Sequence, residues 1–276
     1  MKISARGPGI YWRWRETAFL FIMTDDKTLT LGEGERLERI NRDLRLIQNL
    51  NGLLYGTDAY MLAAFIKPCR GGSACELGAG TGVISLLCAH AEKFASIEAV
   101  EIQPYYAELT ERNARLNGLE DKIDVRCADV RELRGVMCGS FDAVFANPPY
   151  MKAGNGKANP DERKYIARHE VKGGIIDFVK AASRLLKFGG RFYCVMRPDR
   201  LCDLLCFMRE CRIEPKRIRT VHDNEKAEPS VCLVEGVRGG NPSLIFERPL
   251  FLHNASDGCR TAEANSVYEN LNFDNI

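Results

Sequence analysis

The most informative motif of this 276-residue chain is Glu76-Leu77-Gly78-Ala79-Gly80-Thr81-Gly82. The segment Ser73–Leu77 is typical of a buried strand, and Val83 to His90, after the stretch, is typical of a helix. Glycines between a strand and a helix let the backbone turn tightly and approach a ligand closely. The stretch therefore predicts an α/β fold built around a nucleotide-binding loop.

The spacing of the glycines distinguishes between nucleotide cofactors. A dinucleotide-binding loop of the form G-x-G-x-x-G beginning at Gly78 needs a glycine where this chain has Val83. The loop is instead G-x-G-x-G, with the acidic residue Glu76 just before it. This pattern resembles the first motif of class I S-adenosylmethionine-dependent methyltransferases. The resemblance implies that S-adenosyl-L-methionine is the cofactor and that the glycines lie against its methionine portion.

Two further acidic residues follow predicted strands. Ser96 to Val100 is the second predicted strand and leads into Glu101, about twenty residues past the loop, where a carboxylate accepts from both ribose hydroxyls. Asp129 follows the third, Lys122 to Cys127, and is placed to accept from the adenine amine. We expect the cofactor to contact Tyr55, Thr57, Asp58, Glu76, Gly78, Gly80, Thr81, Gly82, Glu101, Ile102, Asp129, Val130 and Asn147.

A second motif ends the apolar run Phe141–Ala146 in Asn147-Pro148-Pro149-Tyr150. Prolines cannot extend a strand ladder, so the chain must leave the sheet there. A rigid hydrogen-bond acceptor beside a flat ring, at the carboxyl end of a parallel strand, suits a planar amine. The motif alone fits an ordinary strand-ending turn equally well, and the glycine loop before it favours a catalytic site.

Asn-Pro-Pro-Tyr after such a loop resembles methyltransferases that act on planar nitrogens: adenine N6, guanine N2 or a glutamine amide. The resemblance implies that the Asn147 amide oxygen and the Pro148 carbonyl accept from the substrate amine. Pro149 then helps to fix the turn, and Tyr150 stacks on the target. Catalysis by positioning and preorganised dipoles needs no metal, and the proton leaves to water after the transfer.

The segment from Met151 to Lys172 has little periodicity and twice as many basic as acidic residues. This surplus favours phosphate contact over a merely solvated loop, and the candidate RNA contacts are Lys152, Arg163, Lys164, Arg168 and His169. Segments around Gln48, Thr57 and Arg168 resemble the bacterial tRNA adenine-N6 methyltransferases that modify adenosine 37 of valine tRNA. This resemblance extends roughly from Glu35 to Leu271 and implies tRNA as the substrate.

Other substrates remain open at this stage. Asn-Pro-Pro-Tyr also occurs in glutamine methyltransferases of release factors and in guanine-N2 methyltransferases of ribosomal RNA. The release-factor enzymes usually carry a larger helical amino-terminal domain, for which the residues before Leu53 are few. A non-catalytic RNA-binding protein is a further alternative, against which the set Glu101, Asp129 and Asn147 argues.

The predicted elements form a Rossmann-like, doubly wound class I methyltransferase sheet of seven strands, the last antiparallel, with a small amino-terminal cap. The later strands are expected at 191–196, 213–222 and 230–237, and helices at 103–117, 173–187 and 199–211. We expect a disordered extension at 1–34, a cap segment at 35–68, the methyltransferase domain at 69–253 and a tail at 254–276. Met23-Thr24-Asp25-Asp26 within the extension resembles an ordinary protein start.

Within the cap segment, Leu37, Ile40, Leu44 and Ile47 recur at helical spacing. Thr57 or Asp58 is expected to cap a second helix that begins near Ala59. Further on, Arg209, Arg212, Lys216, Arg217 and Arg219 form either a second basic patch or a solvated helix–strand junction.

The composition sets the remaining expectations. A formal net charge of +2 neither demands nor excludes nucleic acid, and no apolar run is long enough to span a membrane. The eleven cysteines include no C-x-x-C pair, and we interpret those in apolar runs or on helix faces, among them Cys75, Cys127, Cys194, Cys202, Cys206 and Cys232, as small buried hydrophobes. We expect a cytoplasmic monomer or weak dimer that binds no metal.

Overall fold

A computed structural model describes residues 30–50, 52, 56–149, 174–271 and 273. The chain divides into a unit at Met1–Glu33 and a larger unit at Gly34–Ile276, to which every described helix and strand belongs. The predicted amino-terminal extension lies almost wholly outside the described residues.

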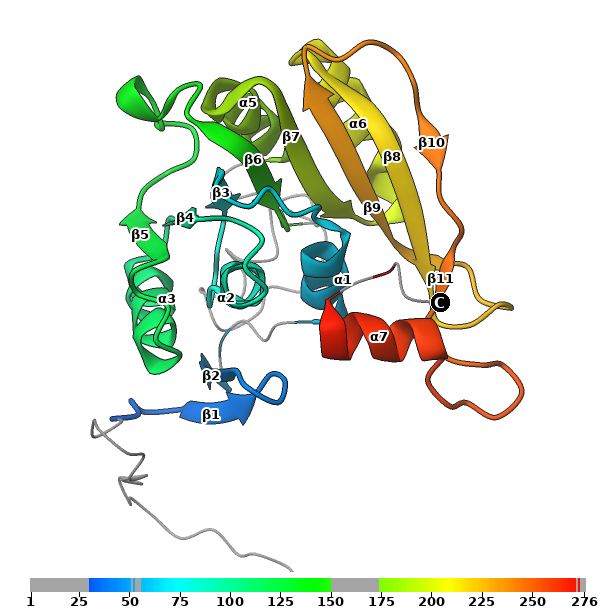
Figure 1. The fold of residues 1–276 in the computed structure, drawn as a ribbon, viewed down its shortest axis with the longest axis horizontal. Helices are drawn as coiled ribbons and strands as arrows, with labels where there is room; N and C mark the ends of the chain where they lie inside the picture. The colour runs from blue at the N-terminus through cyan, green and yellow to red at the C-terminus, as the bar shows by residue number, and fades with distance from the viewer. Residues whose placement is uncertain (1–29, 51, 53–55, 150–173, 272, 274–276) are drawn as a thin grey trace, which may run out of the picture. The chain divides into compact units, whose positions relative to one another are not determined.

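One large sheet forms the larger unit (Figure 1), with strand order β10-β8-β9-β7-β6-β3-β4-β5 and β11 also paired with β8. Strands β3 to β7 run parallel, and β9 runs antiparallel to both β7 and β8. The prediction of a doubly wound sheet whose last main strand is antiparallel is therefore confirmed. The main strands are β3 (Ser73–Leu77), β4 (Ser96–Glu101), β5 (Ile123–Cys127), β6 (Phe141–Ala146), β7 (Leu186–Met196), β8 (Ile213–His222) and β9 (Pro229–Arg238).

The outer edge of the sheet was not anticipated. Two short strands, β10 (Ile245–Phe246) and β11 (Leu250–Phe251), pair parallel with β8 at separate places. Each strand has only two residues, too few to show a period of two in the sequence.

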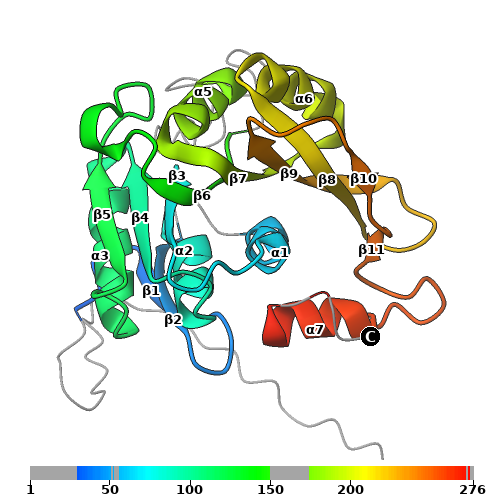
Figure 2. The same ribbon diagram turned by 45° about the horizontal axis from the view of Figure 1, so that its top comes forward.

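Helices cover both faces of the sheet (Figure 2). On one face lie α1 (Thr57–Phe65), α2 (Val83–His90), α3 (Pro104–Leu116) and α7 (Ala262–Asn270), and on the other α5 (Ile175–Leu185) and α6 (Leu201–Glu210). Short 3₁₀ turns occupy Gly135–Met137 and Pro198–Arg200. Side chains of β6 alternate between the two apolar clusters, Phe145 in one and Val144 in the other. Burial on both faces explains why this strand is continuously apolar from Ala143 to Ala146.

The segment with helical spacing is a β-hairpin, so that interpretation is wrong. Strand β1 (Glu35–Arg39) pairs antiparallel with β2 (Arg45–Asn49). The side chain of Asn113 in α3 accepts from the Ile47 N–H at 2.7 Å and donates to the Ile47 carbonyl at 3.0 Å. Burial of Leu44 and Ile47 would suit a helix equally well. Contacts with α3, far along the chain, therefore decide the structure against the local periodicity.

Two smaller expectations also need correction. Helix α1 begins at Thr57 behind Gly56, and no side chain caps it, so Thr57 and Asp58 are not its cap. Among the cysteines interpreted as buried, Cys127, Cys202 and Cys206 are exposed.

Within the described residues, no helix is long and apolar enough to cross a membrane. The same residues contain no cluster of three His, Cys, Asp or Glu side chains suited to a metal ion.

The start of α2 yields a test of the fold. Gly82 has a φ of +79°, and a Cβ added there would lie 2.6 Å from the Thr110 side chain, whereas Gly118 has a φ of +64° and open space around it. Gly118→Ala should cost about 1–2 kcal/mol of unfolding free energy for the left-handed backbone. Gly82→Ala should cost about 1–3 kcal/mol more, because the new methyl group overpacks the site. Urea denaturation of both variants measures the difference, and equal losses would contradict the close packing at Gly82.

Candidate active site

The glycine loop between β3 and α2 has a backbone that favours glycine at three positions. Gly78, Gly80 and Gly82 have φ angles of +74°, +57° and +79°. The N–H groups of the first two loop residues donate to the Val100 carbonyl at the end of β4, at 2.8 and 3.0 Å. From the other side, the Thr110 hydroxyl of α3 donates to the Gly80 carbonyl at 2.9 Å. The loop is thus held between the neighbouring strand and a neighbouring helix.

Glu101 lies against this loop, at the end of β4. Its carboxylate accepts from the N–H groups of Gly80 and Gln103, each at 2.9 Å. Only 6% of the residue is exposed, and burial raises the pKa of its carboxyl, an effect that the N–H donors oppose. Glu101 therefore lies beside the glycine loop, and its contact with the ribose hydroxyls of the cofactor stays a prediction.

Asp129 follows β5 and is already paired. The Arg131 guanidinium Nε donates to its two carboxylate oxygens at 2.9 and 3.0 Å. Val130 beside it is buried, and Ile102, after β4, is half-buried. Glycine loop, Glu101 and Asp129 follow consecutive parallel strands of one sheet, so they lie at the same edge.

Glu76 lies deeper than the other acids. Its carboxylate accepts from the Ser85 N–H at 3.0 Å and from the Ser85 hydroxyl, in the first turn of α2. Burial, above all, raises the pKa of Glu76 to about 8. The described contacts of this side chain thus go to α2, beneath the loop that it precedes.

Asn147, at the end of β6, meets the start of α1. Its amide Nδ2 donates to the Asp58 Oδ2 at 3.0 Å, and the Asp58 Oδ1 accepts from the Ala59 N–H at 3.0 Å. An ionised carboxylate only accepts hydrogen bonds, so Asp58 selects the amide end that faces α1 and turns the amide oxygen the other way. Pro148 is buried and Pro149 half-buried.

Several predicted site residues lie outside the described residues: Tyr55, Tyr150, Lys152, Arg163, Lys164, Arg168 and His169. The described ones gather at the carboxyl ends of β3, β4, β5 and β6, with Thr57 and Asp58 at the start of α1. Sequence reasoning missed Thr110 and Asn113, whose side chains donate to the carbonyls of Gly80 and Thr81 at 2.9 and 3.0 Å. Both residues lie inside α3 and follow no motif, so only their contacts identify them.

A seven-stranded core with this strand order, whose G-x-G-x-G loop meets an acid from the next strand, defines the class I S-adenosylmethionine-dependent methyltransferases. The family model described as "Methyltransferase small domain" matches residues 55–205, more than half of the chain. The chain belongs to this family, and its methyl donor is S-adenosyl-L-methionine. The residues present suit this cofactor. The glycine backbone has no side chains to obstruct a ligand, and the Glu101 carboxylate lies beside it, where it accepts a hydrogen bond from the Gly80 N–H.

Relatives with curated names share much of this chain. A tRNA1(Val) (adenine(37)-N6)-methyltransferase of Porphyromonas gingivalis is 30% identical over 187 residues, which cover 65% of this chain and 72% of the relative. A protein of the same name from Histophilus somni is 27% identical over 186 residues, which cover 65% of this chain and 78% of the relative.

Solved structures share the fold. One, described as a predicted O-methyltransferase from Agrobacterium tumefaciens, has a TM-score of 0.64 and 23% identity, covering 77% of this chain and 95% of that one. The tRNA m1G37 methyltransferase of M. jannaschii has a TM-score of 0.53 and 17% identity, covering 78% of this chain and 60% of that one.

The raised pKa of Glu76 predicts a pH-dependent stability in the absence of cofactor. Between about pH 5 and pH 8, the folded protein keeps a proton on Glu76 that the unfolded chain has released. The native state therefore binds more protons, and stability falls as the pH rises, by at most about 1.4 kcal/mol per pH unit for this group.

Glu76→Gln isolates this effect, because glutamine still accepts from Ser85 but does not titrate. The unfolding free energy of the wild type should fall relative to that of Glu76→Gln over this pH range. Urea denaturation at several pH values measures both, and parallel profiles would contradict the raised pKa.

Proposed function

We propose that this methyltransferase acts on tRNA and transfers the methyl group to the exocyclic N6 amine of an adenine, adenosine 37 of valine tRNA. The observation that carries the proposal is the orientation of Asn147 by Asp58 at the end of β6. That orientation directs an amide oxygen away from α1, as recognition of an exocyclic amine on a flat ring requires. The names of the relatives from P. gingivalis and H. somni support tRNA as the source of that amine.

The proposed cofactor site uses the acids at the strand ends. A carboxylate has about four acceptor positions, so Glu101 can accept from ribose hydroxyls while it holds the N–H groups of Gly80 and Gln103. Asp129 would accept from the adenine amine, and Ile102 and Val130 would lie along the base. The glycine loop would leave room for the methionine portion. Tyr55 and Thr57 are proposed to complete the site.

The proposed chemistry is the placement of a nucleophilic nitrogen. When bound, S-adenosyl-L-methionine supplies an electrophilic methyl group on a sulfonium. The Asn147 Oδ1 and the Pro148 carbonyl accept the two N–H groups of the substrate amine, which directs the nitrogen lone pair towards that methyl group. The charge of Asp58 polarises the Asn147 amide and so strengthens Oδ1 as an acceptor. An amide does not take up the proton, which leaves to water after the transfer.

The proposed substrate is tested with total bacterial tRNA and labelled S-adenosyl-L-methionine, followed by digestion and nucleoside mass spectrometry. We expect N6-methyladenosine as the labelled product, and no product from Asn147→Ala. An anticodon loop is single-stranded, so its adenine can be turned out at low cost. N2-methylguanosine as the product, or transfer only to a release factor, would instead favour one of the two alternatives.

Asp58 provides a sharper test of the mechanism. Asp58→Ala should lower kcat roughly 10–100-fold, somewhat less than the loss of a whole stabilising group, because the Asn147 amide is then free to turn. Asp58→Asn keeps an acceptor oxygen and should retain more activity than Asp58→Ala. Asp203→Ala is the matched control, since Asp203 also lies in the first turn of a helix, α6.

Two outcomes would contradict this role of Asp58. The first is a kcat for Asp58→Ala that equals that of the control variant. The second is a loss of S-adenosyl-L-methionine affinity by calorimetry that accounts for the whole effect, which would leave Asp58 only the cofactor contact expected from the sequence.

A further inference from the structure

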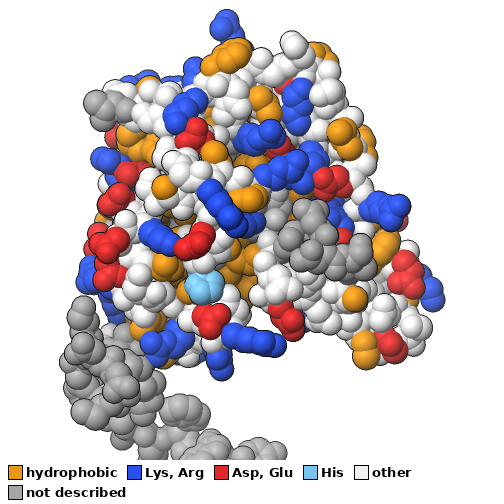
Figure 3. All heavy atoms as spheres, viewed as in Figure 1, with side chains coloured by type: hydrophobic (Ala, Val, Ile, Leu, Met, Phe, Trp, Pro, Cys, Tyr) orange, Lys and Arg blue, Asp and Glu red, His pale blue; other side chains and the backbone are white. Residues whose placement is uncertain are grey.

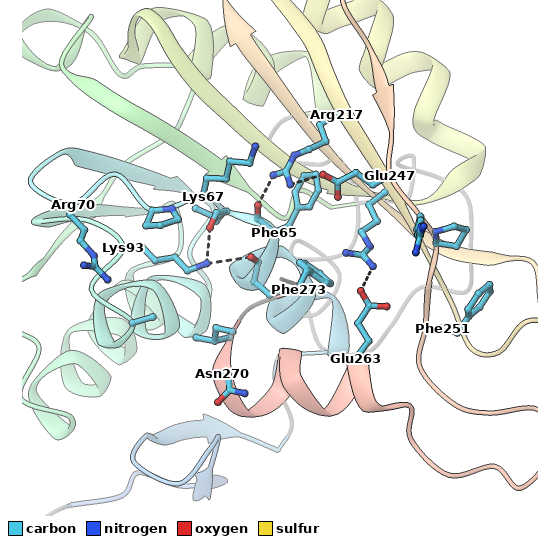
Figure 4. Close-up of a pocket in the computed structure, with 18 residues that line it drawn as sticks. Phe65, Lys67, Arg70, Lys93, Arg217, Glu247, Phe251, Glu263, Asn270 and Phe273 are labelled. Carbon is cyan, nitrogen blue, oxygen red and sulfur yellow. Dashed lines mark hydrogen bonds and ion pairs between the residues drawn. The ribbon is translucent and has the colours of Figure 1, made fainter. Parts of the chain in front are cut away.

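A cavity of about 970 Å³ opens on the face of the sheet that α1 and α7 cover (Figure 4). Six basic side chains line it, against two acidic ones, Glu247 and Glu263. That is a strong local concentration for a chain with a net charge of +2. Lys and Arg side chains also gather over the same face of the molecule (Figure 3). The basic residues are Lys67, Arg70, Lys93, Arg217, Arg219 and Arg248.

Two of these cations form the floor of the cavity and are neutralised there. The Arg217 guanidinium donates to Glu235 at 2.7 Å, to Glu247 at 2.8 Å and to the Phe65 carbonyl at 2.8 Å. Arg219 is buried and pairs with Glu263. Because both carry compensating carboxylates, they shape the cavity and add little net charge to it.

Lys93 prepares the same cavity for an anion. The carboxyl end of α1 points into it, and the negative end of a helix dipole repels anions. The buried Lys93 ammonium donates to the carbonyls of Ala63 at 2.7 Å and Ile66 at 2.6 Å at that helix end. This positive charge offsets the helix end, so the repulsion no longer opposes an incoming anion.

Three cations at the rim complete the arrangement. Lys67, Arg70 and Arg248 are exposed, and none of them forms an ion pair with another described residue. Lys67 and Arg70 come from the loop between α1 and β3, and Arg248 comes from the segment between β10 and β11. Cations on separate segments suit successive phosphates along a chain better than one small anion, which needs converging donors.

We propose that this cavity binds backbone phosphates of the RNA substrate at a site apart from the methyl-transfer site. Helix α1 joins the two places, because Asp58 in its first turn contacts Asn147 and the Phe65 carbonyl at its last turn contacts Arg217. Nine helical residues span about 13 Å. The inference rests on the proposed function, since it takes tRNA as the molecule that occupies the cavity. The bound phosphates would belong to the stem next to the target loop.

The test compares two triple variants. Lys67→Ala, Arg70→Ala and Arg248→Ala together remove the rim cations. Lys180→Ala, Arg209→Ala and Arg115→Ala together remove the same charge from exposed positions on α5, α6 and α3. Circular dichroism melting establishes that both variants fold. Fluorescence anisotropy with labelled total tRNA then gives the affinity between about 50 and 200 mM salt.

We expect the rim variant to bind tRNA at least about tenfold more weakly at low salt, with a salt slope shallower by about two to three units. The control variant should bind like the wild type. The rim variant should also show a raised KM for full-length tRNA.

Wild-type affinity and slope in the rim variant would overturn the site, even if the enzyme methylates tRNA as proposed. An equal loss in the control variant would also overturn it, because bulk charge would then explain the binding. If the wild-type protein methylates no tRNA, the proposed function is wrong. The proposal that the cavity binds the RNA substrate is then wrong as well.

Discussion

The turn from β3 into α2 constrains the rest of the site. Few backbone conformations and few side chains are compatible with it. Gly82 combines a left-handed φ with a Cβ position that the Thr110 side chain already occupies. Strand β3 lies between β4 and β6, so this turn also determines where the ends of both neighbours can come close to it. The Val100 carbonyl and the Glu101 carboxylate of β4 both accept from loop N–H groups. The position of Glu101 is therefore a consequence of how the loop is closed.

Helix α1 extends this constraint to the other side of the molecule. Seven of its nine residues are buried, so it has no solvent-facing side and is held by apolar contacts around most of its surface. Interiors packed at such density transmit displacements, so one end cannot move far without the other. Its first turn orients Asn147 through Asp58, and its last turn contacts Arg217 and Lys93. One short helix thus contacts both Asn147 and the basic cavity.

What could be predicted from the sequence depended on how local its cause was. Strands β3 and β6 and helix α2 have the bounds that their apolar runs indicate. An element that is buried on both faces needs apolar side chains at successive positions, and such a run is visible in the sequence. The approach of Glu101 to the glycine loop follows from strand order alone. The hairpin at 35–49 could not be found in this way, because its partner Asn113 is 66 residues away from Ile47. The same holds for Asp58 and Asn147, which are 89 residues apart and belong to separate motifs.

Basic residues show most clearly what the sequence cannot predict. A count of Lys and Arg does not say which of these side chains can bind a phosphate. The basic residues Lys216, Arg217 and Arg219 within β8 could form one patch by their spacing in the sequence. In the fold, Arg217 forms an ion pair with Glu235 and Arg219 forms one with Glu263, while Lys216 donates to the Ser243 hydroxyl at 2.9 Å. A cation that already holds a buried carboxylate would have to give up that partner before it could bind an anion. The cations at the rim of the cavity come from segments that no pattern marks, and they are exposed and form no ion pair with a described residue. Pairing and exposure, rather than density along the chain, therefore decide where an RNA backbone would be held.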